Sequence, residues 1–212
     1  MSEHTAAETR DHFIRWPKIY DHFVNVFTFG RAVRLRQATI DVAQIRSGES
    51  VLDAGCGTGD LTLFAKEATG PRGHVDGIDG SPEMLAVAAR KAQQRGLDVK
   101  FSQARMQDLS FANDRFDVVL ASLSLHMLSV DAQTIALSEF KRVLRPGGRL
   151  VIVDFDAPTT TVGKLMAHLS GHGAVDPLSK NHVPAITRLG FVDIKRVALP
   201  LDAVAALRAV KR

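Results

Sequence analysis

The sequence predicts an α/β fold, a doubly wound and mostly parallel sheet with helices on both faces. Two observations indicate this class. Short apolar segments alternate with amphipathic helical segments along the chain, and one apolar segment ends in three alternating glycines, Gly55, Gly57 and Gly59. Alternating strands and helices form parallel sheets, because each helix carries the chain back to the edge where the next strand begins. With 212 residues, 45% of them hydrophobic, the chain can form one core.

Five short apolar segments are the candidates for the parallel strands. They lie at 48–54, 74–79, 98–102, 116–122 and 149–155. Their length suits strands that are buried on both faces, and the segments between them have the periodicity of helices.

Two of the intervening helices have clear start and stop signals. Ser81 is expected to cap a helix that begins at Pro82 and ends at Gly96. The buried stripe of this helix is expected to be Leu85, Ala88, Ala89 and Ala92. A later helix is expected to start at Asp131 and to stop at Pro146-Gly147-Gly148. Its buried stripe is expected to be Ala136, Phe140, Val143 and Leu144.

The C-terminal part of the chain has a looser pattern. A helix is expected at 161–170, a loop at 171–179 and a short helix at 182–189, followed by a strand at 191–197. The closing segment, 202–210, is ambiguous, although its alanines favour a helix.

The glycine loop indicates a cofactor that contains a nucleoside. Glycine adopts positive φ and lets a ligand approach the backbone, and the helix that follows presents free N–H groups. A dinucleotide fingerprint reads G-x-G-x-x-G. Here the third glycine comes one residue early, Asp60 replaces the last glycine, and Asp53 precedes the loop. Two carboxylates disfavour a diphosphate, and with it a nicotinamide-dependent dehydrogenase. They suit a ligand with an ammonium and a sulfonium, as in S-adenosylmethionine.

Four motifs in order resemble those of the class I S-adenosylmethionine-dependent methyltransferases. They lie within residues 48–157, at 51–60, 74–85, 115–122 and 144–153. The resemblance implies a Rossmann-like methyltransferase fold with a seven-stranded sheet, whose last strand is antiparallel. The segment 202–210 is therefore expected to be that strand.

The resemblance also implies which residues bind S-adenosylmethionine. Asp79 ends the second strand about 20 residues after the last glycine, where its carboxylate can accept hydrogen bonds from both ribose hydroxyls. Arg105 stands where the family pattern has an acidic residue for the adenine amino group, so the N–H of Met106 and either Gln107 or Asp108 are expected to bond adenine. The expected cofactor-binding residues are Tyr20, Asp53, Gly55, Cys56, Gly57, Asp79, Gly80, Met84, Met106, Gln107 and Ala121.

Gly80 and Met84 are expected to pack on the adenine ring, and Cys56 to be a small side chain beside the ligand. Because Cys56 is the only cysteine, an internal disulfide and a cysteine-based metal cluster are excluded. We expect no metal. Three C-terminal histidines, His168, His172 and His182, do not have the spacing of a metal site. We expect them to be polar residues of the surface or of the pocket.

The first 45 residues are expected to form a helical lid or cap, and residues 46–212 a single methyltransferase domain. Most of the aromatic residues of the chain gather near the N-terminus, in the set Phe13, Trp16, Ile19, Tyr20, Phe23, Val24, Phe27 and Phe29. Ordinary packing and a lid explain this cluster equally well. Tyr20-Asp21 resembles a Tyr-Asp pair that closes over the cofactor in the quinone-biosynthesis branch of the family. A lid would exclude water from the reactive sulfonium.

His126 is the candidate catalytic residue. Methyl transfer needs mainly an acceptor held in line with the methyl group, and a general base only where the acceptor must lose a proton early. His126 follows the fourth strand at the edge where open α/β sheets bind ligands. Histidine has an ordinary pKa of about 6.5, which suits proton transfer near neutrality. The alternative is that His126 only lines the pocket. Asp154 and Asp156 follow the fifth strand and are candidates to bind the acceptor or to orient His126.

The leading functional hypothesis is a methyltransferase that acts on a small, apolar or aromatic acceptor. A nucleic-acid methyltransferase is the alternative enzyme. It is disfavoured because Ser122-Leu123-Ser124-Leu125 replaces the Asn/Asp-Pro-Pro-aromatic signature of amino-methylating enzymes. A non-catalytic module that only binds the cofactor stays open because of Arg105.

Composition adds little about partners. The net charge of +4 comes from scattered basic residues, which favours a solvated surface over a nucleic-acid-binding patch. No apolar run approaches the ~18 residues that a membrane helix needs, and residues 1–11 are polar, so we expect no transmembrane segment and a cytoplasmic protein. A homodimer is compatible with the sequence.

Overall fold

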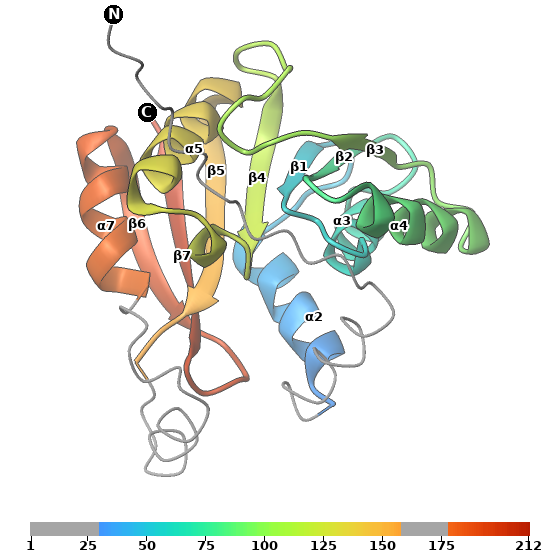
Figure 1. Ribbon diagram of the computed structural model, residues 1–212, viewed down its shortest axis with the longest axis horizontal. Coiled ribbons are helices and arrows are strands. Elements are labelled where there is room, and N and C mark those ends of the chain that lie inside the picture. Colours follow the sequence, from blue (N-terminus) through green and yellow to red (C-terminus); the bar gives the residue numbers. More distant parts are fainter. Residues whose placement is uncertain (1–29, 158–177) are drawn as a thin grey trace, which may run out of the picture.

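The computed structural model describes residues 30–157 and 178–212 (Figure 1). The expected lid with Tyr20, the helix expected at 161–170, and His168 and His172 lie outside the described residues. Among the described helices, none combines the length and the apolar character needed to span a bilayer.

A seven-stranded sheet forms the centre of the described part, with strand order β3-β2-β1-β4-β5-β7-β6. The strands are β1 (Ser50–Ala54), β2 (His74–Asp79), β3 (Lys100–Gln103), β4 (Phe116–Ser122), β5 (Leu144–Phe155), β6 (Phe191–Ala198) and β7 (Val204–Lys211). The first five strands pair in parallel, whereas β7 pairs antiparallel with both β5 and β6. The expected doubly wound α/β sheet and its antiparallel last strand are therefore confirmed.

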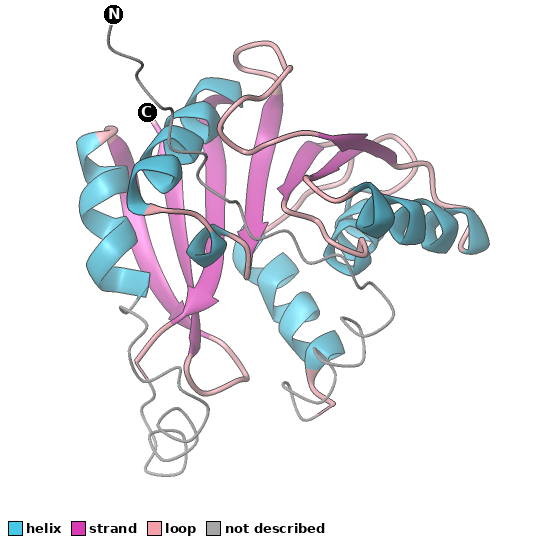
Figure 2. Ribbon diagram, in the orientation of Figure 1, coloured by secondary structure: helices cyan, strands magenta, loops and turns pink. Residues whose placement is uncertain are grey.

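Helices cover both faces of the sheet, as Figure 2 shows. They are α2 (Ala32–Ala43), α3 (Asp60–Thr69), α4 (Pro82–Gln94), α5 (Val130–Val143) and α7 (Leu178–Arg188), with a 3₁₀ turn, η1 (Leu125–Met127), after β4. One core cluster joins α5 and α7 to residues such as Ile152, and a second joins α2 and α3 to residues such as Val153. Successive residues of β5 thus face opposite layers, as pleated strands require.

Two of the expected buried stripes are partly wrong. In α4 the side chains that face the sheet are Met84, Ala88 and Ala92, whereas Ala89 is exposed. These three positions are spaced by four residues and therefore lie on one face of the helix. The methyl group of Ala88 fits against Gly59, since a Cβ on that glycine would lie 2.6 Å from it.

The second correction concerns α5 and the start of β5. Ser129 caps this helix by accepting a hydrogen bond from the N–H of Ala132, so α5 starts at Val130, one residue before Asp131. Leu137 is buried in the helix, whereas Leu144 already belongs to β5 and pairs with Phe116. Pairing along β4 therefore ends the helix before the Pro-Gly-Gly sequence is reached.

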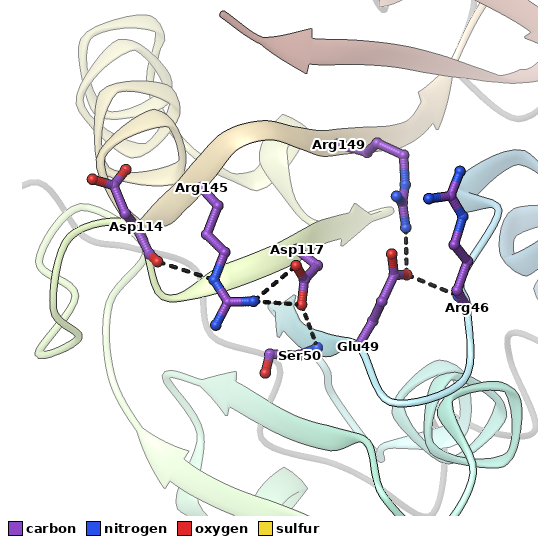
Figure 3. A network of polar contacts seen from close by, with 7 residues as sticks. All are labelled: Arg46, Glu49, Ser50, Asp114, Asp117, Arg145 and Arg149. Carbon is purple, nitrogen blue, oxygen red and sulfur yellow. Dashed lines mark hydrogen bonds and ion pairs between the residues drawn. The ribbon is translucent and has the colours of Figure 1, made fainter.

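Ion pairs and hydrogen bonds fasten the amino edge of the sheet, where the parallel strands begin (Figure 3). Asp117 accepts hydrogen bonds from the Arg145 guanidinium at 2.9 and 3.0 Å and from the N–H of Ser50 at 2.8 Å. Glu49 accepts from Arg149, whose Nε also donates to the Ala43 carbonyl at 2.9 Å. These contacts connect β1, β4, β5 and α2 at the edge opposite the glycine loop.

Candidate active site

The glycine loop between β1 and α3 has the backbone that the sequence predicts. Gly55 has φ +76°, and the N–H groups of Gly55 and Cys56 both donate to the Ile78 carbonyl, at 2.8 and 2.9 Å. A Cβ on Gly55 would lie 2.4 Å from Cε of Met106 and 2.6 Å from Cβ of Ser124. The segments after β3 and β4 thus converge on this loop, and only glycine leaves the backbone accessible there.

Asp79 connects the glycine loop to the start of α4. Its carboxylate accepts hydrogen bonds from the N–H groups of Gly57 and Ser81, each at 2.9 Å. Burial raises the pKa of Asp79, and the backbone hydrogen bonds oppose that shift. Because a carboxylate has about four acceptor positions, part of its capacity is left for hydroxyl donors.

Asp53 supplies a buried carboxylate under a pocket of about 60 Å³ between α2, the glycine loop and the end of β4. It is 1% exposed and accepts a 2.6 Å hydrogen bond from the Thr62 hydroxyl. Burial is the main cause that raises its pKa to about 6. Asp60, the other carboxylate of the loop, forms ion pairs with Arg36 at 2.9 Å and Lys91 at 2.8 Å. The negative charge available to a ligand in this pocket therefore comes from Asp53.

The other residues expected to bind the cofactor surround the same loop. Cys56 is buried against Gly77, where a Cβ would lie 3.2 Å from its Sγ, and burial raises the pKa of its thiol. The carbonyl of Gly80 accepts a 3.0 Å hydrogen bond from Gln103. Met84 and Ala121 are buried, and Met106 and Gln107 are half-buried. Arg105 forms a backbone bridge with Asp108, which shapes the loop after β3.

His126 lies in η1, directly after β4. Its Nδ1 is 2.6 Å from Oδ1 of Asp154, and its backbone N–H donates to Oδ2 of the same carboxylate at 3.1 Å. A carboxylate only accepts hydrogen bonds, so Nδ1 carries a proton, and in the neutral form of the ring Nε2 presents a lone pair. The ring of Phe155 lies edge-on against the imidazole with 4.9 Å between centroids, and the His126 side chain is 27% exposed. This arrangement can accept a proton at Nε2.

The two carboxylates that the sequence suggests as partners of His126 have different partners in the structure. Asp154 holds the imidazole, whereas Asp156 accepts a 2.6 Å hydrogen bond from Nε of Arg196. Two positioning residues were missed, Thr62 beside Asp53 and Ser124, whose hydroxyl donates to the Ala54 carbonyl. Ser124 could have been predicted from the sequence, because it stands between the fourth strand and His126.

Comparisons with known proteins identify the family of this chain. The methyltransferase domain family matches residues 51–148. A demethylmenaquinone methyltransferase of Thermus thermophilus is 40% identical over 139 residues, which cover 66% of this chain and 62% of that protein. A ubiquinone/menaquinone biosynthesis C-methyltransferase of Bdellovibrio bacteriovorus is 37% identical over 157 residues, covering 73% of this chain and 66% of that protein. The chain thus matches slightly less than two thirds of the length of these relatives.

Two further proteins extend the comparison. A demethylmenaquinone methyltransferase of Staphylococcus aureus is 34% identical over 168 residues, covering 78% of this chain and 68% of that protein. The crystal structure of an S-adenosylmethionine-dependent methyltransferase from Aquifex aeolicus has the same fold, with a TM-score of 0.74 and 19% identity, and covers 94% of this chain and all of that one. The chain therefore belongs to the class I S-adenosylmethionine-dependent methyltransferases, in the branch that includes the demethylmenaquinone methyltransferases.

Proposed function

We propose that this protein transfers the methyl group of S-adenosylmethionine to a ring carbon of a small hydroxylated aromatic acceptor of the quinone type. The observation that carries the proposal is the His126–Asp154 pair directly after β4, because it presents a basic nitrogen at the edge where parallel sheets bind ligands. The names of the relatives support the quinone class.

The residues around the glycine loop fit this cofactor. Asp79 is fixed by backbone N–H groups and retains capacity for ribose hydroxyls. Asp53 provides a buried carboxylate below a pocket that suits the ammonium end. Met84, which is buried in α4, and Met106, whose Cε approaches Gly55, are our candidates to contact the adenine ring. When bound, S-adenosylmethionine supplies a methyl group on a positively charged sulfur.

His126 then acts as general base. Its Nε2 accepts the proton of an acceptor hydroxyl, which increases the electron density on the ring carbons and favours their attack on the methyl group. Asp154 holds the imidazole in the required tautomer and stabilises the imidazolium that forms. After the carbon–methyl bond forms, the ring carbon releases its own proton to solvent water, the oxygen takes back the proton held by His126, and aromaticity returns. Positioning of the acceptor contributes the rest of the rate.

The test measures transfer of isotopically labelled methyl groups to 1,4-dihydroxynaphthalene, with bulk tRNA as the competing acceptor. We expect label in the naphthalene, on carbon, and none in the tRNA. Label only in tRNA would favour the nucleic-acid alternative. Cofactor binding without transfer to any acceptor would favour the non-catalytic module. A cytoplasmic location and a homodimer stay predictions from the sequence.

A further inference from the structure

His182 lies on the face of α7 that packs against the sheet. Leu178, His182 and Ile186 are spaced by four residues, and the two apolar members are buried in the same core cluster as Ile152 of β5. His182 itself is 5% exposed. Asp154 follows Ile152 by two residues and therefore points to the same layer of the molecule. The sequence favoured surface or pocket polarity for this histidine, and the structure buries it.

One nitrogen of this buried ring has no partner within residues 30–157 and 178–212. Nδ1 is 3.3 Å from the Leu178 carbonyl, and because a carbonyl only accepts, Nδ1 carries the proton. Nε2 is buried and makes no hydrogen bond among the described residues. Buried polar atoms are rarely left unpaired, so this nitrogen requires an explanation.

Two residues of the proposed active site influence the pKa of His182. Burial lowers the pKa of His182, the Asp154 carboxylate opposes that shift, and His126 adds to it. The ring is therefore neutral near pH 7, with a lone pair at Nε2. The His126–Asp154 pair belongs to the same layer, because Leu125, next to His126, lies in the core cluster that also holds Leu178 and Ile186 of α7.

We propose that Nε2 of His182 accepts a hydrogen bond from a second hydroxyl of the methyl acceptor, and that this bond positions the ring relative to His126. This inference rests on the proposed function. His126 takes the proton of one hydroxyl, and His182 holds another hydroxyl without removing its proton. His182 is thus a binding residue that selects acceptors with a hydrogen-bond donor at that position, in preference to a carbonyl or an ether.

The test compares two acceptors in the wild type and in His182→Leu. The probes are 1,4-dihydroxynaphthalene and its monomethyl ether, 4-methoxy-1-naphthol, titrated by calorimetry in the presence of S-adenosylhomocysteine. In the wild type we expect the diol to bind about tenfold more tightly than the ether, as for one hydrogen bond. In His182→Leu the two probes should bind equally, with KM for the diol raised about tenfold and kcat changed less.

Two controls separate positioning from structure. His182→Gln retains an acceptor group and should recover part of the preference for the diol. Thermal unfolding of His182→Leu should show only a small loss of stability, because leucine removes an unpaired buried nitrogen and gives up only the long Nδ1 hydrogen bond to the Leu178 carbonyl. Equal binding of both probes by the wild type, or the same preference in the wild type and His182→Leu, would overturn the role of His182. Wild-type protein that binds and methylates neither probe would instead overturn the proposed function.

Discussion

The two edges of the parallel sheet differ in how many of their polar groups keep free hydrogen-bonding capacity. At the amino edge, Asp117 and Glu49 are each bonded both to a guanidinium and to a backbone N–H (Figure 3). At the carboxyl edge, Asp53 is bonded to one hydroxyl, and the imidazoles of His126 and His182 each present a lone pair at Nε2.

The amino edge therefore contributes mainly to stability, and the carboxyl edge mainly to ligand binding and catalysis. Satisfied charges at the amino edge connect the strand ends to one another and to α2. Groups at the carboxyl edge keep part of their hydrogen-bonding capacity for ligands, which costs stability in the ligand-free protein. Substitutions at the two edges should therefore have separable effects on activity and on unfolding.

The largest expected effect is that of His126→Ala at the carboxyl edge. Loss of the general base should lower kcat by a factor of about 10²–10⁴, whereas the Kd for S-adenosylmethionine should change by less than about twofold. Steady-state kinetics and calorimetry measure the two quantities. His74→Ala, at an exposed histidine on β2, is the matched control. Unchanged turnover in His126→Ala would reduce this histidine to pocket lining.

Arg149→Met should have the largest effect at the amino edge. Arg149 is 7% exposed and bonded to Glu49 and to the Ala43 carbonyl. Without Arg149, the Glu49 carboxylate loses its guanidinium partner. The free energy of unfolding should therefore fall by about 3–5 kcal/mol. In Arg145→Met, where the side chain is 48% exposed, the loss should be about 0–1 kcal/mol. Urea denaturation measures both. Equal losses would show that burial does not govern this edge.

Asp53 predicts a pH dependence at the carboxyl edge. Its pKa is raised to about 6 in the folded protein, so folding favours the protonated form. This contribution to stability is fully present below the pKa of the unfolded chain, near 3.9, and is lost as the pH rises through about 6. Relative to Asp53→Asn, the wild type should lose roughly 2–3 kcal/mol between pH 4 and pH 7. Urea denaturation of ligand-free protein at several pH values tests this, and parallel stability profiles would contradict it.

Asp79→Ala should weaken the binding of S-adenosylmethionine by about 1.5–3 kcal/mol, in line with the loss of hydrogen bonds to a charged group. Calorimetric titration measures the change, and Asp98→Ala, at an exposed position after α4, serves as control. Cofactor affinity that is equal in the two variants would remove Asp79 from the ribose site.

Much of the fold was predictable because its signals are local. The glycine loop, the Ser81 cap with Pro82, and the five parallel strands each depend on a few adjacent residues. The errors arose where packing between elements decides. Leu85 and Ala89 are separated by four residues, as are Met84 and Ala88, so spacing alone does not choose between the two faces of α4. The face that is buried contains Ala88, which packs against Gly59.

By itself, the sequence determined the class of fold, the type of cofactor and the strand edge where His126 lies, since glycine spacing and strand order specify these. Only the tertiary structure decided that Asp154 rather than Asp156 holds His126, and that His182 is buried in the same layer. The partners of His126 and of Asp156 lie 28 and 40 residues away along the chain. The first pairing depends on the register of β4 with β5 and the second on the registers of β5, β7 and β6, while the burial of His182 depends on the packing of α7. No local pattern encodes these.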